Sequence, residues 1–449
     1  MSTTTSVFSS PTSIPLPINP VEVEFQRLKA RLHEQLVESF DLSRIGRIDS
    51  EKLSNEIRTM AQAAINNNKE LRGRIDRERL LNELTDEIFG LGPLEKLMKD
   101  PTVTDILVNN ANSVYVERHG RLEETDVVFA NDDHVLRVIQ RIVSRLGRRI
   151  DEANPMVDAR LPDGSRVNAV VPPLALEGPT ISIRRFGAEP LQAHNLLQNN
   201  SIAQDMLTFL SAAVDSRVSI LVSGGTGAGK TTFLNVLSRY IPKEERVITI
   251  EDSAELILQH RHRIRMETRP SNTEGTGEVT QRDLVRNSLR MRPDRIIVGE
   301  VRGPEVWDML QAMNTGHEGS LTTIHANTTR DALARLEMMV AMTGFDFPVA
   351  VVRQYAAAGI HLLVHVSRLK GGARRVMEIS EIVSVKDGQY EVTDIFGFEQ
   401  TGVDKDGRAI GEFFATGYRP KCLQRLKAAG IELPDTLFNK RRWMPGAAS

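Results

Sequence analysis

The sequence contains a single cysteine, Cys422, among its 449 residues. One cysteine cannot form an intrachain disulfide framework and cannot build a cysteine-based zinc site, so both are excluded. This composition fits a reducing compartment, and we expect a cytoplasmic protein.

Long apolar runs are also missing. No segment approaches the ~18 consecutive apolar residues of a membrane-spanning helix. The first residues lack the basic and apolar regions of a secretory signal. We therefore expect any membrane association to be peripheral and to depend on partner proteins.

Aromatic residues make up only 5% of the chain, and the formal net charge is −2. Proteins that track single-stranded nucleic acid rely on aromatic stacking platforms and positive charge, so we expect no direct nucleic-acid binding. Hydrophobic residues (40%) and charged residues (26%) occur in ordinary globular proportions. The length allows about two to four domains.

What the chain does contain is a phosphate-binding loop. The pattern G-x-x-x-x-G-K-[ST] is matched by Gly224, Gly225, Thr226, Gly227, Ala228, Gly229, Lys230 and Thr231, and Thr232 follows it. The glycines allow the backbone N–H groups to surround an anion, the lysine reaches the β- and γ-phosphates, and Thr231 is placed to bind Mg²⁺. The flanking pattern predicts a strand at 218–222 and a helix at 232–240, which is the context that the motif requires.

Two further segments supply carboxylates. The apolar run 295–299 ends in Glu300, which we expect on the Mg²⁺ side of the site; the alternative is a structural ion pair with Arg302. The predicted strand 247–250 is followed by Glu251, Asp252 and Glu255, and one of these can polarise the attacking water. The alternative is a solvated acidic turn, and the chemistry alone does not choose among the three.

Two histidines flank the predicted strand that follows residue 316. A neutral imidazole can donate a hydrogen bond to a phosphate oxygen, so His317 and His325 are candidates for contacts with the γ-phosphate. The alternative is that each is an ordinary surface or core residue.

The periodicity predicts an α/β protein with several parts. We expect a disordered tail (1–20), a helical module (21–98), an α+β domain (99–187), a linker (188–200) that acts as a hinge, and a parallel-sheet domain with a C-terminal extension (201–449). Within the α+β domain we expect one strand at 125–129 and a helix capped by Asn131.

These motifs together resemble the secretion ATPase superfamily, the motors of type II secretion, type IV pili and type IV secretion. The matching boxes are the phosphate loop, the acidic segment 251–255, the GEVRG segment 299–303 and the histidine segment 316–325. Segments 87–94, 114–118 and 290–303 are most similar to the CpaF/TadA branch, which assembles the Tad (Flp) pilus. The resemblance covers about residues 81–382.

The resemblance implies a RecA-like ATPase domain behind a PAS-like α+β domain and a leading helical bundle. It implies that the enzyme hydrolyses ATP with Mg²⁺, with Glu255 as catalytic carboxylate and Glu300 as the metal-side glutamate. Arg184 stands where relatives direct an arginine towards the phosphates, and Arg160 and Arg166 lie nearby in sequence; the alternative is a surface ion pair. Ser253 stands where pilus motors often carry proline, so we expect a slightly different turn there.

The resemblance also implies a homo-hexamer at the cytoplasmic face of the inner membrane. There it would contact pilus platform proteins and power Tad pilus assembly. One alternative is a type IV secretion or conjugation ATPase that moves protein or DNA. A second is a nucleotide-binding adaptor that does not hydrolyse ATP, which the presence of both glutamates disfavours. A GTPase is disfavoured because no N-K-x-D motif occurs.

Overall fold

The computed structural model describes residues 77–445, apart from 119, 186–190, 272–275 and 406, together with residues 25, 26, 29, 31, 32, 58, 59, 62 and 63. The expected tail and most of the expected helical module lie outside this set. The chain divides into two compact units, Met1–Gly187 and Ala188–Ser449.

The first unit is an antiparallel sheet with helices. Its sheet has six strands in the order β3-β2-β1-β6-β5-β4. Its elements are α3 (Arg77–Phe89), η3 (Gly92–Leu94), α4 (Glu95–Lys99), β1 (Val103–Asn110), β2 (Ser113–Arg118), β3 (Arg121–Glu124), α5 (Asp132–Arg145), β4 (Met156–Arg160), β5 (Arg166–Val170) and β6 (Thr180–Arg184).

Helix α5 covers one face of this sheet because its sequence is strongly amphipathic. Its buried stripe includes Val135, Ile139 and Ile142, which join the strand side chains in one core. The side chain of Asn131 caps the helix by accepting a hydrogen bond from the backbone N–H of His134, at 2.9 Å. The expected cap is therefore confirmed.

The strand expected at 125–129 is wrong, because the third strand is β3 and ends at Glu124. The alternation that suggested a strand has another cause. Val127 and Phe129 are buried beneath the sheet as the chain crosses towards α5. Alternating burial in a connection produces the same sequence pattern as a half-buried strand.

The second unit alternates strands and helices and then ends in antiparallel strands. Its ten-stranded sheet has the order β16-β15-β14-β13-β12-β7-β11-β10-β8-β9. Its elements are α6 (Ala193–Gln198), α7 (Gln204–Asp215), β7 (Ile220–Gly224), α8 (Lys230–Ser238), β8 (Val247–Glu251), β9 (Arg263–Glu267), α9 (Gln281–Ser288), β10 (Arg295–Val301), α10 (Glu305–Asn314), β11 (Leu321–His325), α11 (Thr329–Ala341), α12 (Val349–Gly359), β12 (Leu362–Arg368), β13 (Arg374–Lys386), β14 (Gln389–Val403), β15 (Ala409–Ala415), α13 (Leu423–Ala428), η4 (Asp435–Phe438) and β16 (Arg441–Trp443).

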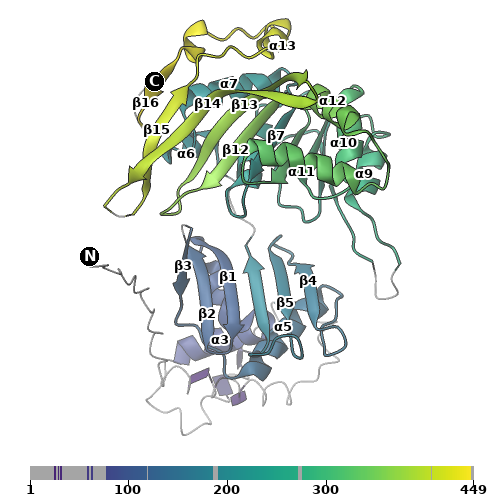
Figure 1. Ribbon diagram of the computed structural model, residues 1–449. Helices are drawn as coiled ribbons and strands as arrows, with labels where there is room; N and C mark the ends of the chain where they lie inside the picture. Colours follow the sequence, from purple (N-terminus) through teal and green to yellow (C-terminus); the bar gives the residue numbers. More distant parts are fainter. Residues whose placement is uncertain are drawn as a thin grey trace, which may run out of the picture. The chain divides into compact units, whose positions relative to one another are not determined.

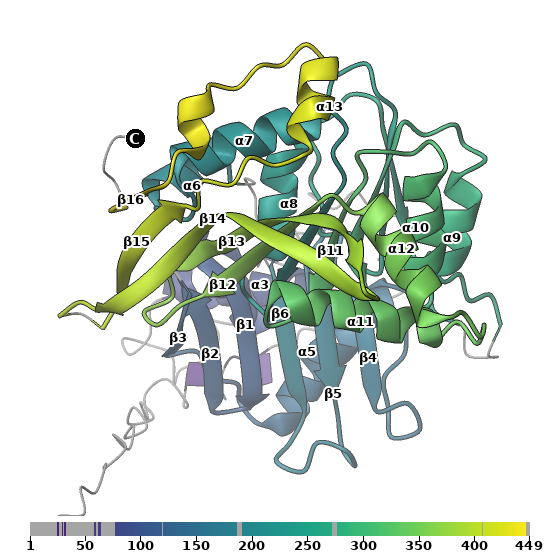
Figure 2. The same ribbon diagram turned by 45° about the horizontal axis from the view of Figure 1, so that its top comes forward.

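Strands β12, β7, β11, β10, β8 and β9 run parallel to one another, which confirms the expected α/β class. Helices cover both faces of this part of the sheet (Figures 1 and 2). Ile220 and Val222 of β7 pack with α7 and α8, whereas Leu221 packs with α10, α11 and α12. Because successive side chains of a strand alternate, one buried strand supplies both cores.

A helix lies within the segment that was expected to be a linker, 188–200. Helix α6 forms inside it, and Leu196 is buried in the same core as α7. A hinge in this region therefore cannot include the residues of α6 without unpacking that side chain.

Among the described residues, none of the helices combines the length and the apolar character needed to cross a bilayer.

Candidate active site

The phosphate loop joins β7 to α8 at the carboxyl edge of the parallel strands. Gly227 and Gly229 have φ values of 69° and 94°, in the region that favours glycine. A side chain at Gly224 would collide with the carbonyl oxygen of Val366 on β12. Helix α8 begins at Lys230, two residues earlier than expected, so the side chains of Lys230 and Thr231 project from its first turn.

The ammonium of Lys230 is held over the loop. Its Nζ donates hydrogen bonds to the carbonyl oxygens of Gly224 (3.0 Å) and Gly225 (3.2 Å) and lies 3.6 Å from Glu300 Oε1. Burial lowers the pKa of Lys230, and the nearby carboxylate opposes that effect. The ammonium of Lys230 therefore lies where the backbone N–H groups of the loop could bind the phosphate oxygens of a nucleotide.

Glu300 lies near the end of β10, where it contacts Lys230 and forms the ion pair with Arg302 that was considered from the sequence. One carboxylate oxygen faces Lys230, and the other accepts a hydrogen bond from Arg302 Nη2 at 2.7 Å. Burial raises the pKa of Glu300, but the bond from Arg302 and the charge of Lys230 outweigh burial, so its pKa is lowered. The side chain is therefore ionised at neutral pH.

Glu255 is the carboxylate of the acidic segment that reaches the loop. The hydroxyl of Thr231 donates to its Oε2 at 3.5 Å. Glu251 instead points inward, where its Oε1 accepts the backbone N–H groups of Glu255 (2.9 Å) and Leu256 (2.8 Å). Asp252 lies 3.6 Å from Arg302. The three carboxylates thus make different contacts, which their spacing in the sequence did not reveal.

The buried position of Glu251 makes stability depend on pH. Burial raises its pKa from 4.5 to about 7. Between these values the folded protein keeps a proton that the unfolded chain has released, so the free energy of unfolding falls as pH rises, by about 3 kcal/mol in total. We expect Glu251→Gln, which stays neutral, to match wild type near pH 4.5 and to exceed its stability above pH 7.

Urea unfolding of the nucleotide-free and Mg²⁺-free protein at pH 5 to 8 measures this difference. A difference between the two proteins that stays constant with pH would show that the native carboxyl is ionised throughout.

The two candidate histidines lie at opposite edges of the sheet. His325 ends β11 and pairs with Gly224, the first residue of the phosphate loop, whereas His317 precedes the start of β11. Residues on either side of a strand are separated by its full length, about 13 Å for five residues. The structure therefore places His325, and not His317, beside the loop of this chain. Contact of either histidine with the γ-phosphate remains a prediction.

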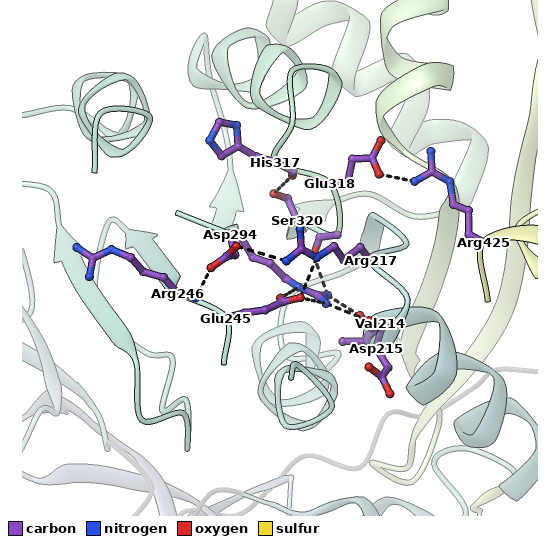
Figure 3. A network of polar contacts seen from close by, with 12 residues as sticks. Val214, Asp215, Arg217, Glu245, Arg246, Asp294, His317, Glu318, Ser320 and Arg425 are labelled. Atoms are coloured by element: carbon purple, nitrogen blue, oxygen red, sulfur yellow. Dashed lines mark hydrogen bonds and ion pairs between the residues drawn. The ribbon is translucent and has the colours of Figure 1, made fainter. Parts of the chain in front are cut away.

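His317 lies instead near a buried polar network at the amino edge of the sheet. Arg295, which is fully buried, forms an ion pair with Glu245, and Arg217 donates to the same carboxylate at 2.8 Å. Figure 3 shows the ring of His317 pointing away from the carboxylate of Glu245. Within the described part of the chain, its Nδ1 is buried without a hydrogen-bond partner.

The three candidate arginines belong to the first unit. Arg184 ends β6, and its Nε lies 3.4 Å from Asp105 Oδ1. Arg166 pairs with Asp158, and Arg160 donates to the carbonyl oxygen of Gly164. Their action on a nucleotide remains a prediction.

Two arginines that the sequence did not single out lie against the phosphate loop. Arg374 Nε donates to the carbonyl oxygen of Gly227 at 2.9 Å. Arg368 pairs with Arg374 across strands β12 and β13. The sequence signal that could have identified them is a pair of arginines on either side of a Gly-Gly turn. That signal does not show that the hairpin lies beside the phosphate loop, because the position of the hairpin depends on the order of strands in the sheet.

The donor atoms fit ATP and Mg²⁺. The glycine cradle and Lys230 suit phosphates, and the oxygens of Thr231, Glu255 and Glu300 suit a hard cation. No cluster of three or more His, Cys, Asp or Glu side chains that could hold a metal occurs among the described residues.

Comparison with known proteins identifies the family. The family model described as Type II/IV secretion system protein matches residues 87–366. A putative conjugal transfer protein of Mycobacterium tuberculosis is 38% identical over 74% of this chain and 94% of its own length. The conjugal transfer protein TrbB of Rhizobium radiobacter is 31% identical over 70% of this chain and 93% of its own length.

Among solved structures, the VirB11 ATPase of the Brucella suis type IV secretion system is 28% identical. It covers 66% of this chain and 97% of its own, with a TM-score of 0.36. The matches confirm the secretion ATPase superfamily that the motifs resemble, and they do not distinguish the Tad pilus branch within it. The family model and the conjugal transfer relatives together show that the chain belongs to the Type II/IV secretion system protein family.

Proposed function

We propose that this protein is an ATP-driven motor of a type IV secretion or conjugation machine, which moves protein or DNA. The observation that carries the enzymatic part is the meeting of Lys230, Thr231, Glu255 and Glu300 at one loop. The machine is proposed from two relatives, which are named for conjugal transfer and align over nearly their whole length.

In the proposed reaction, water attacks the γ-phosphate in line with the leaving oxygen. Glu255 orients the water and accepts its proton, because its carboxylate lies at the hydroxyl of Thr231. Lys230 exchanges its two loop carbonyls for phosphate oxygens, and His325 donates to the γ-phosphate. Thr231 and Glu300 would hold Mg²⁺, which would neutralise charge on the phosphates.

The proposed working form is a homo-hexamer at the cytoplasmic face of the inner membrane. It would be attached there through membrane-embedded partners. In such a ring, Arg184 of the first unit would stabilise transition-state charge, an effect worth about 10³–10⁵ in rate in other nucleotide hydrolases. The net charge of −2 supports a motor that drives transport without itself binding nucleic acid.

Tad pilus assembly through pilus platform proteins is the second candidate. The observation that favours it is the resemblance of residues 290–303 to the CpaF/TadA branch. A motor of either machine would use the same catalytic site, so only the cellular product separates the two functions.

Deletion of the gene in the source cell tests the proposal. We expect transfer of a marked plasmid, or secretion of the transported protein, to fall to background while surface pili persist. Complementation with wild type should restore transfer, whereas complementation with Lys230→Ala should not. Loss of pili with normal transfer would replace the proposal with the second candidate, and hydrolysis stimulated by DNA would contradict the expected lack of nucleic-acid binding.

A further inference from the structure

The hairpin between β12 and β13 carries two arginines past the carboxyl edge of the sheet. Val366 of β12 is in register with Gly224, so Arg368 lies two residues beyond the start of the phosphate loop. The hairpin turns through Gly371 and Gly372, with φ values of 83° and 85°. The backbone N–H of Ala409 donates to the carbonyl oxygen of Lys370 at 3.1 Å and braces the turn.

Both arginine side chains lie against the glycines of the loop. Arg374 Nε donates to the carbonyl oxygen of Gly227 at 2.9 Å, and its Cδ would lie 3.3 Å from a Cβ on Gly229. Arg368 Nη1 would lie 3.5 Å from a Cβ on Gly227. Both arginines are exposed and lie beside the glycines of the loop.

The charges of this pair are arranged for an anion. Arg368 and Arg374 are direct cross-strand partners, and like charges at such positions destabilise a sheet. A bound anion would be attracted to both side chains. Guanidinium groups bind phosphate oxygens through paired N–H donors, which makes a nucleotide phosphate a suitable anion.

The sheet order places this pair on the side of the loop away from the carboxylates. Strand β12 is next to β7 on one side, while β11, β10 and β8 follow on the other. Glu300 is the last residue but one of β10, and Glu255 lies just after the end of β8. The loop therefore has an acidic side, suited to Mg²⁺ and water, and a basic side formed by Arg368 and Arg374.

We propose that Arg368 and Arg374 bind the phosphate chain of the nucleotide from this basic side. The inference rests on the proposed ATPase function and adds a binding role within the same subunit as the loop. The pair lies away from the carboxylates that face the attacking water, so it sets nucleotide affinity and retention of ADP more than the rate of bond cleavage.

The test uses the full chain, a fluorescent ADP analogue and steady-state ATP hydrolysis. We expect Arg368→Gln and Arg374→Gln each to weaken ADP binding about tenfold, and the double variant about 100-fold, as expected for loss of charge-assisted hydrogen bonds. KM for ATP should rise in parallel, with kcat within about threefold of wild type. Binding of AMP should weaken less than binding of ADP, because fewer phosphates are contacted.

Lys386→Gln is the matched control. Lys386 is exposed at the other end of β13, about 40 Å along the strand from Arg374, and the change removes the same charge. It should bind ADP as wild type does. Arg→Lys variants at positions 368 and 374 should recover part of the lost affinity, which a purely structural defect would not allow.

If Arg374→Gln does not fold, Arg368→Gln and Arg374→Lys carry the test. A double variant that binds ADP as tightly as wild type overturns this inference alone. A loss confined to kcat, with ADP affinity unchanged, also overturns it. A wild-type protein that neither binds nor hydrolyses nucleotide overturns the proposed function as well.

Discussion

Lys230→Ala is expected to reduce ATP hydrolysis about 10³-fold, equivalent to about 4 kcal/mol of lost transition-state stabilisation. The ammonium is the positive charge that the first turn of α8 places over the loop, 3.0 Å from the carbonyl oxygen of Gly224. Without it, the charge that develops between the β- and γ-phosphates loses the ammonium group that lies directly over the loop. Phosphate release from the purified protein measures the effect.

Lys243→Ala provides the control, because Lys243 is an exposed lysine of the same unit. It should hydrolyse ATP as wild type does. Turnover by Lys230→Ala within tenfold of wild type would remove Lys230 from the mechanism and would undermine the assignment of the loop as the catalytic phosphate site.

Glu255→Gln is expected to slow the chemical step about 10²–10³-fold while nucleotide binding is retained. The amide keeps the shape of the side chain and can still contact the hydroxyl of Thr231, but it cannot accept a proton from water. Single-turnover hydrolysis measures the step, and binding of a fluorescent ATP analogue shows that the site is intact.

Glu251→Gln is the informative comparison for this variant. Its amide oxygen can still accept the backbone N–H groups of Glu255 and Leu256, so we expect a much smaller loss of rate. If Glu251→Gln were the slower enzyme and Glu255→Gln turned over normally, the catalytic role would belong to Glu251.

Much of the fold could be predicted because its signals are local. The strands of the parallel sheet and the cap at Asn131 follow from periodicity and from side-chain chemistry within a few residues. Errors arose where burial depends on distant packing. Val127 and Phe129 alternate like a strand but fill space beneath a sheet, and Leu196 anchors a helix in a segment whose sequence suggested only a linker.

By itself, the sequence determined that the chain has a phosphate loop with the right flanking elements, and that Glu300 and the acidic segment follow it. Each of those features is a short continuous segment that can be recognised without knowing the fold. A glycine-rich turn before a helix has the same geometry wherever it occurs. Only the tertiary structure decided which acidic side chain contacts Thr231, which histidine lies beside the phosphate loop, and which arginines contact that loop. Strand order and register set those distances, and neither can be read from residues that are more than 140 positions apart, as Gly227 and Arg374 are.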